Sequence, residues 1–243
     1  MSSRCVIIGD IKRSRDIDNW SNIFKKVETT LEEVNKLFSD DILVNFKPTI
    51  GDEFQGVLKS PQNAYALYTF IKCKLLVDIY CGIGIGEIEM PLEEGVGMRG
   101  TAFYRARDAL ELCKKSKRNL LVKSSDAPNQ TDEIINTLLR FIEAFENSWT
   151  KRQQEVVSYF RLHPDYTYEQ LGKHFGISKQ TIYDILNAAD WATISEGEAL
   201  LNKLLRNINS DVKRINFTKE GKAKMPYKEK VRQKWLTQVK CAE

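Results

Sequence analysis

The sequence predicts an α+β protein in which a ferredoxin-like domain precedes an all-α helix-turn-helix domain. Two observations support this class. Hydrophobic patterns over the first half follow the order β-α-β-β-α-β and then α-β, and purely helical periodicity takes over after residue 127. The predicted divisions are a first domain (1–126), a connector helix (127–148), a helix-turn-helix domain (149–205) and a basic tail (206–243).

The elements of the first domain follow from the spacing of apolar residues. Short β-branched runs bounded by glycine or turn residues predict strands, and apolar residues spaced three and four apart predict helices. A Gly51-Asp52 turn joins two of the strands as a hairpin. The predicted strands are residues 4–9, 42–50, 53–58, 77–86 and 119–123. The predicted helices are residues 20–38, a helix after Pro61, and residues 102–115.

Composition excludes several classes of protein. With 243 residues, 42% hydrophobic and 29% charged, the chain resembles an ordinary globular protein. No stretch approaches the roughly 18 apolar residues of a membrane span, and a strand follows the N-terminus directly, so we expect an intracellular, cytoplasmic protein without a membrane partner. The five cysteines form no Cys-x-x-Cys pair and there are two histidines, which argues against disulfides or zinc.

Two aspartates are candidate metal ligands. In the split βαβ arrangement the hairpin lies beside the end of the first strand, so Asp10 and Asp52 should meet at one rim of the sheet. Carboxylates are suitable ligands for Mg²⁺ or Mn²⁺. The alternative is that Asp10 caps a helix and Asp52 only forms the turn. A basic loop that would lie near a phosphate follows the first strand: Lys12, Arg13, Ser14 and Arg15.

The first domain resembles the class III nucleotidyl cyclases and, more distantly, the GGDEF diguanylate cyclases. Four motifs occur in the same order and at similar spacing, in residues 6–11, 47–54, 82–88 and 100–111. The resemblance implies a palm-like fold, Asp10 and Asp52 as ligands of Mg²⁺ or Mn²⁺, a bound nucleoside triphosphate, and a homodimer.

The departures from the cyclase pattern concern the catalytic positions. Tyr104 and Asp108 stand where the cyclases carry Asn and Arg, although Arg105 and Arg107 lie one position away and would contact a phosphate. The base-selecting position falls on Pro48, which has no side-chain donor or acceptor. The neighbouring Lys47 is a further candidate for nucleotide binding. An ordinary cyclase is therefore not expected, and no catalytic residue is assigned.

The chain as a whole is more similar to the SatD family. The shared features are Gly9-Asp10-Ile11 with a following Ser14-Arg15, the run from Gly51 to Gly56, and a C-terminal helix-turn-helix. The resemblance covers about residues 4–200 and implies no particular activity.

The second domain carries a helix-turn-helix pattern. Leu171, Phe175 and Ile182 fall at buried positions, and Gly176 supplies the turn. The candidate DNA-binding residues are Lys173, Ser178, Lys179, Gln180, Thr181, Tyr183 and Asn187. Lys151, Arg152 and Arg161 would add contacts to the DNA backbone. The alternative is a helical bundle used for dimerisation or for packing on the first domain.

Charge is distributed unevenly along the chain. Residues 206–243 hold eleven basic and four acidic residues, which is typical of a tail that meets an anionic partner or of a solvated end. Taken together, these patterns predict a regulatory protein with a metal- and nucleotide-binding domain joined to a DNA-binding helix-turn-helix. Two alternatives remain open, an active nucleotidyltransferase and a catalytically inert dimerisation platform.

Overall fold

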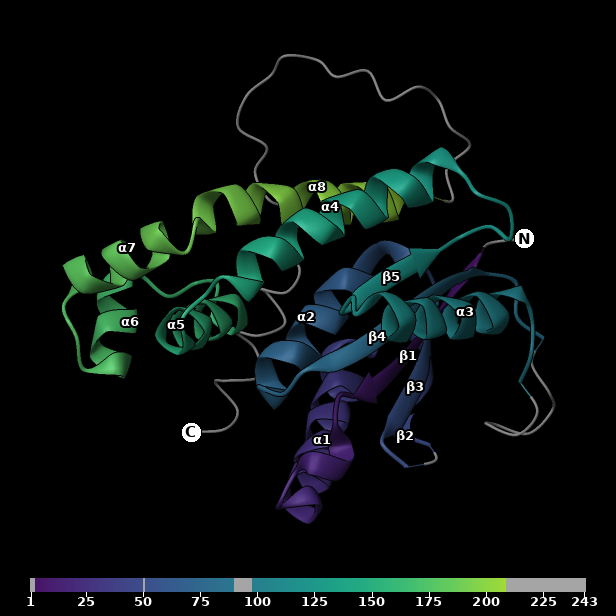
Figure 1. The fold of residues 1–243 in the computed structure, drawn as a ribbon, viewed down its shortest axis with the longest axis horizontal. Coiled ribbons are helices and arrows are strands. Elements are labelled where there is room, and N and C mark those ends of the chain that lie inside the picture. The colour runs from purple at the N-terminus through teal and green to yellow at the C-terminus, as the bar shows by residue number, and fades with distance from the viewer. Residues whose placement is uncertain (1–2, 50, 90–97, 209–243) are drawn as a thin grey trace. The chain divides into compact units, whose positions relative to one another are not determined.

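The computed structural model describes residues 3–49, 51–89 and 98–208, which form two compact units (Figure 1). Residues 3–143 and 201–208 belong to the first unit, and residues 144–200 belong to the second. Two helices, α4 (Gln130–Asn147) and α8 (Trp191–Asn207), have residues in both units. The basic tail lies outside the described residues, apart from residues 206–208.

A five-stranded mixed sheet forms the centre of the first unit, and its strand order is β2-β3-β1-β4-β5. The strands are β1 (Arg4–Ile11), β2 (Ile42–Pro48), β3 (Glu53–Leu58), β4 (Ile79–Gly86) and β5 (Leu120–Lys123). All neighbours are antiparallel except β4 and β5. The predicted α+β class is confirmed, and so is the position of the third strand between the first two.

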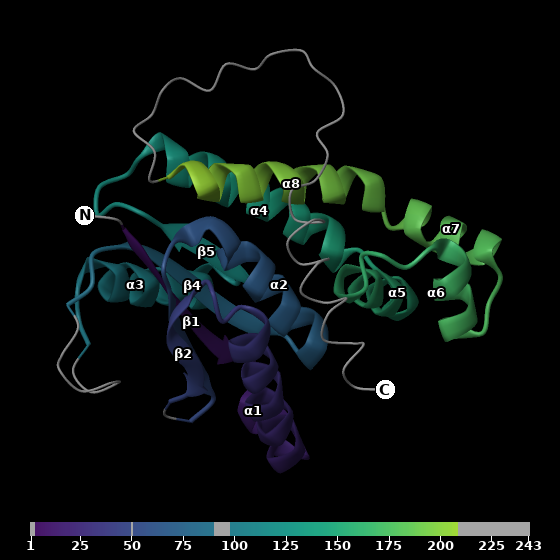
Figure 2. The same cartoon turned by 180° about the vertical axis from the view of Figure 1, so that it is seen from behind.

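Helices cover both faces of this sheet (Figures 1 and 2). On one face α1 (Trp20–Leu37) packs on β2 and on α2 (Ala64–Leu75). On the other face α3 (Thr101–Ser116) packs on β4, β1 and β5. Short 3₁₀ turns, Ser14–Asp16 and Pro61–Asn63, precede α1 and α2. Side chains alternate along β1, so Val6 and Ile8 pack with α3.

Glycines in β4 allow α3 to lie unusually close to the sheet. A Cβ added at Gly82 would lie 2.1 Å from the carbonyl oxygen of Ala106, and one at Gly84 would lie 2.1 Å from that of Ala102. Both contacts are to helix backbone, which cannot move aside as a side chain can. The pattern Gly-Ile-Gly-Ile-Gly therefore combines a row of glycines under α3 with isoleucines buried on the opposite face.

The second unit consists of helices around a small apolar core. The core residues are Val156, Val157, Leu171, Ile182, Leu186 and Ala189. They come from α5 (Lys151–Leu162), α6 (Tyr168–Phe175), α7 (Lys179–Ala188) and the residue after α7. Thr150 and Thr167 begin α5 and α6 with capping boxes. Gly176 ends α6 with a φ of 66°, a left-handed conformation that favours glycine, as the sequence predicts.

Two findings on the described residues concern their cysteines and the hydropathy of their helices. Cys5, Cys73, Cys81 and Cys113 are buried free thiols. No helix in the described part of the chain is both long enough and apolar enough to cross a membrane.

Candidate functional site

Three carboxylates meet at one rim of the sheet. Asp10 in β1 lies directly opposite Glu53 in β3, and the Ile11 N–H donates to the Asp52 carbonyl at 3.3 Å. The strand topology therefore brings Asp10 and Asp52 together, as the sequence predicts. Glu53 is a third member, which was not predicted from the sequence. The hairpin register identifies it, because the first residue after the turn pairs with Asp10.

Each rim carboxylate is held by a different protein donor. The Lys114 ammonium lies 2.8 Å from Asp10 Oδ2 and 3.8 Å from Glu53 Oε1. Arg107 donates through Nη1 to both oxygens of Glu53, at 2.7 and 2.9 Å. The Ser14 hydroxyl donates to Asp52 Oδ2. The rim is thus a network of three carboxylates and two cations, with one hydroxyl.

Helix α3 supplies both cations of the rim. Arg107 and Lys114 are seven residues apart, close to two helical turns, so they project from the same side of α3. The glycine row of β4 fixes the distance of this helix from the sheet. The close packing of α3 on β4 therefore positions both cations over the ends of β1 and β3.

Burial and neighbouring charges act together on Asp10. Its side chain is 13% exposed, and burial is the largest influence that raises the pKa of this carboxyl. Lys114 works in the opposite direction, while Asp52 and Glu53 raise the Asp10 pKa further. Burial also opposes the charge of Lys114, but Asp10 and Glu53 outweigh it, so the Lys114 pKa is raised. The ammonium therefore remains protonated beside the carboxylates.

The donor set of this rim fits a hard divalent cation. Asp10, Asp52 and Glu53 offer oxygen ligands only, which Mg²⁺ and Mn²⁺ prefer. In the described residues no three His, Cys, Asp or Glu side chains are already arranged to hold a metal ion. The three carboxylates instead contact Lys114, Arg107 and Ser14.

The side chains of the basic loop after β1 differ in their exposure to solvent. The Lys12 ammonium donates to Asn119 Oδ1 and lies 4.4 Å from the centre of the Tyr80 ring. Burial lowers its pKa. Arg13 has a left-handed backbone with φ of 53°, and both Arg13 and Arg15 are exposed. The side chains of Arg13 and Arg15 are therefore accessible next to the rim, whereas Lys12 is half-buried.

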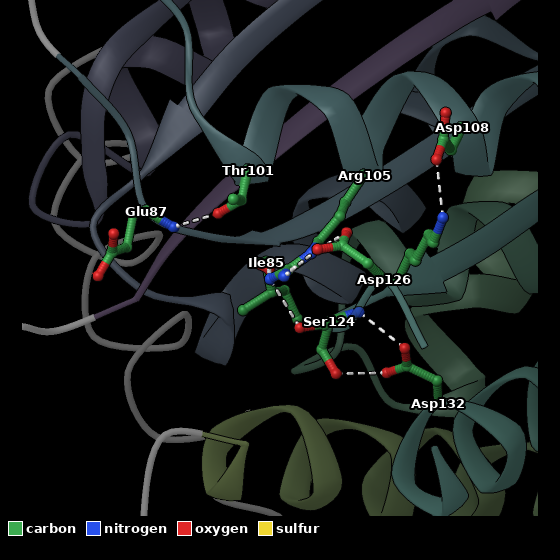
Figure 3. Close-up of polar contacts among 9 residues, drawn as sticks. Ile85, Glu87, Thr101, Arg105, Asp108, Ser124, Asp126 and Asp132 are labelled. Atoms are coloured by element: carbon green, nitrogen blue, oxygen red, sulfur yellow. Dashed lines mark hydrogen bonds and ion pairs between the residues drawn. The ribbon is translucent and has the colours of Figure 1, made fainter. Parts of the chain in front are cut away.

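Arg105 contacts residues other than the rim carboxylates, as Figure 3 shows. Its guanidinium donates to both oxygens of Asp126, at 2.9 and 3.0 Å, and to the carbonyls of Ile85 and Ser124, each at 2.8 Å. Arg105 and Arg107 are two residues apart, about 200° around a helix, so their side chains leave α3 on different sides and contact different residues. Of the two predicted arginines, the structure brings only Arg107 to the carboxylates.

The remaining predicted positions of the first unit are exposed. Lys47 lies on β2 opposite Gln55 of β3. Tyr104 is 63% exposed on α3. Asp108 accepts a hydrogen bond from Lys123 at 2.7 Å (Figure 3). Neither Tyr104 nor Asp108 contributes a donor to the rim carboxylates.

In the second unit all seven predicted DNA-binding residues are exposed on or next to α6 and α7. Ser178 caps α7 by accepting from the Thr181 N–H at 3.0 Å, and Ile182 and Leu186 are buried. The exposed predicted residues are Lys173, Ser178, Lys179, Gln180, Thr181, Tyr183 and Asn187. Within this set Gln180 donates to Asp184 at 3.0 Å, and Lys173 pairs with Glu169 at 3.4 Å.

The prediction that Arg161 contacts a DNA backbone is wrong, because this side chain is only 5% exposed. It forms ion pairs with Glu146 at 2.8 Å and Glu198 at 2.6 Å. It also lies over the rings of Trp149 and Trp191. The burial of Arg161 could not be predicted from the sequence, because basic residues of amphipathic helices usually face solvent.

Both histidines stack on one tyrosine of the second unit. The ring of Tyr159 lies 3.9 Å from that of His163 and 3.8 Å from that of His174, and both pairs are nearly parallel. Burial and a hydrogen bond with Tyr166 raise the pKa of Tyr159 to about 12. The two imidazoles therefore serve packing in this unit, while Trp191 packs on its core as predicted.

The described residues form an α+β unit and a helical unit. The model of the SatD family matches residues 5–191. The chain belongs to the SatD family. A search of curated proteins found no match.

Two solved structures of bacterial light-regulated adenylyl cyclases match half of this chain. The first is 12% identical with a TM-score of 0.40, and covers 50% of this chain and 75% of its own. The second is 13% identical with a TM-score of 0.38, and covers 50% of this chain and 43% of its own.

Proposed function

We propose that the first unit binds a nucleoside triphosphate together with Mg²⁺ or Mn²⁺ at the carboxylate rim. The observation that carries this proposal is the meeting of Asp10, Asp52 and Glu53 with Lys114 and Arg107 at the ends of β1 and β3. Carboxylates bind the cation, and basic side chains beside them bind the phosphates that the cation bridges.

The proposed roles follow from position and exposure. Asp10 and Asp52 hold the cation, and Ser14 keeps the Asp52 carboxylate oriented. Arg13 and Arg15 are exposed next to the rim and meet the phosphates, with Arg107 available from α3. Arg guanidinium groups suit this role because they donate two parallel hydrogen bonds to phosphate oxygens. The bound cation would neutralise phosphate charge and polarise a phosphoryl oxygen.

A thermal-shift screen tests this proposal. The four ribonucleoside triphosphates are added with and without Mn²⁺ to the wild type and to Asp52→Asn. A ligand that binds only the folded state raises the melting temperature. The expected result is a Mn²⁺-dependent rise with at least one triphosphate in the wild type and its loss in Asp52→Asn. A rise of equal size in both proteins would contradict the assignment of Asp52.

Two alternatives predict other outcomes of the same experiment. An active nucleotidyltransferase would convert the stabilising triphosphate to a product, and Asp10→Ala would abolish that product. A catalytically inert dimerisation platform would show neither nucleotide nor metal dependence. We propose a homodimer for either arrangement, and sedimentation at several protein concentrations measures it.

We propose DNA binding as a second function, carried by α6 and α7 as a helix-turn-helix. The supporting observation is that Lys179, Thr181 and Tyr183 of α7 are exposed, whereas Ile182 of the same helix is buried. Residues of this kind contact phosphates and base edges from a helix in the major groove. The whole chain would then be a regulator with a nucleotide-binding unit and a DNA-binding unit.

Fluorescence anisotropy with duplex DNA over a series of salt concentrations tests this second function. The expected result is salt-dependent binding that weakens in Lys179→Gln. Lys115→Gln, which removes the same charge from an exposed position on α3, serves as the matched control. Equal weakening in both variants would indicate a general effect of charge and would contradict a role for α7.

A further inference from the structure

The contact between Lys114 and Asp10 indicates how the rim is balanced without a metal ion. Asp10 is largely buried, and a buried carboxylate requires a compensating positive charge or donor. The Lys114 ammonium supplies that charge at 2.8 Å from Oδ2. No comparably close cation contacts Asp10 among the described residues. Lys114 therefore contacts the carboxylate that the proposed function assigns to the divalent cation.

We propose that Lys114 competes directly with the divalent cation for Asp10, so that cation binding requires its ammonium to leave. This inference rests on the proposed function of the rim. A lysine side chain holds a single point charge on a flexible four-carbon stem, so it can be displaced without movement of α3. Lys114 is 32% exposed, which leaves the ammonium a path into solvent.

The neighbouring contacts show why Lys114, and not Arg107, is the group that exchanges. Arg107 makes two hydrogen bonds with Glu53 through one nitrogen and does not contact Asp10. The second contact of Lys114, to Glu53, is long at 3.8 Å. Departure of Lys114 therefore breaks one close contact and leaves the pairing of Arg107 with Glu53 intact.

Direct titration with Mn²⁺, followed by the electron paramagnetic resonance signal of the free ion, tests this competition. It compares wild type, Lys114→Met and Lys115→Met in the absence of nucleotide. We expect Mn²⁺ to bind about tenfold more tightly to Lys114→Met than to wild type, since one opposing cation beside a ligand is removed. Lys115 is exposed one residue further along α3, so Lys115→Met should resemble wild type.

Thermal unfolding of the same proteins separates competition from a purely structural role. Without metal, Lys114→Met should melt below wild type because Asp10 loses its partner. Added Mn²⁺ should then raise its melting temperature by more than it raises that of wild type. A structural role alone would give the lower melting temperature without the larger rise.

The outcomes distinguish failure of this inference from failure of the proposed function. If wild type binds Mn²⁺, Asp52→Asn does not, and Lys114→Met binds no more tightly than wild type, then the competition is refuted while the metal site stands. If neither wild type nor Lys114→Met binds Mn²⁺, both proposals are overturned.

Discussion

Two ionic centres, one in each unit, use opposite arrangements of charge. In the second unit one cation, Arg161, lies between Glu146 and Glu198 and against two tryptophan rings, at 5% exposure. At the rim of the first unit three carboxylates share two cations, and Lys114 and Arg107 are 32% and 45% exposed. An enclosed cation with rigid aromatic neighbours stabilises a fold, whereas carboxylates with exposed, flexible partners can exchange those partners for ligands.

The largest expected effect is at Arg161. Arg161→Met should lower the free energy of unfolding by about 3–5 kcal/mol, because it leaves two carboxylates without their buried counter-charge. Chemical denaturation monitored by tryptophan fluorescence measures the loss. Adding Glu146→Gln and Glu198→Gln to this variant should recover part of it. If Arg161→Met is as stable as wild type, the enclosed Arg161 does not stabilise the second unit and the contrast with the rim is wrong.

Helix packing should matter more to the first unit than any charge at its rim. Gly84→Ala should cost about 1–3 kcal/mol, since the new methyl group would meet the backbone of α3. Because a shift of α3 moves Lys114, the competitor for Asp10, away from the rim, the substitution should also tighten binding of Mn²⁺ there. Unchanged melting temperature and unchanged Mn²⁺ binding would show that the glycines of β4 do not set the distance of α3 from the sheet.

The rim ion pair should contribute less to stability than the enclosed arginine. Without metal, Lys114→Met should cost about 1 kcal/mol or less, because the pair is partly exposed to water. Denaturation under the conditions used for Arg161→Met gives a direct comparison. A loss as large as that of Arg161→Met would make the rim a structural centre as well.

The smallest effect is expected at Asp126, an exposed partner of Arg105. The hydrogen bond from Arg105 is the main cause that lowers the Asp126 pKa from its ordinary value of 3.8. A lowered folded-state pKa gives stability that is present above the ordinary value and lost as the pH falls through the lowered one. Asp126→Asn should therefore reduce the melting temperature slightly at neutral pH and leave it unchanged in strong acid. A difference that persists in strong acid would assign the effect to something other than this ion pair.

Local patterns predict the strand order and the meeting of Asp10 with Asp52, because both depend on topology alone. Glu53 and Lys114 escaped prediction for different reasons. Glu53 requires the exact pairing of β1 with β3, and Lys114 requires the rotation of α3 about its axis. Arg105 illustrates the second difficulty, since a shift of two residues along a helix moves a side chain to the other side.

X-ray diffraction from crystals grown with Mn²⁺ and a triphosphate, recorded with anomalous scattering from manganese, tests the central claim most directly. The account predicts a manganese peak about 2 Å from carboxylate oxygens of both Asp10 and Asp52, with the Lys114 ammonium no longer in contact with Asp10. A rim without manganese, with Lys114 still bonded to Asp10 while the triphosphate lies elsewhere, would contradict it.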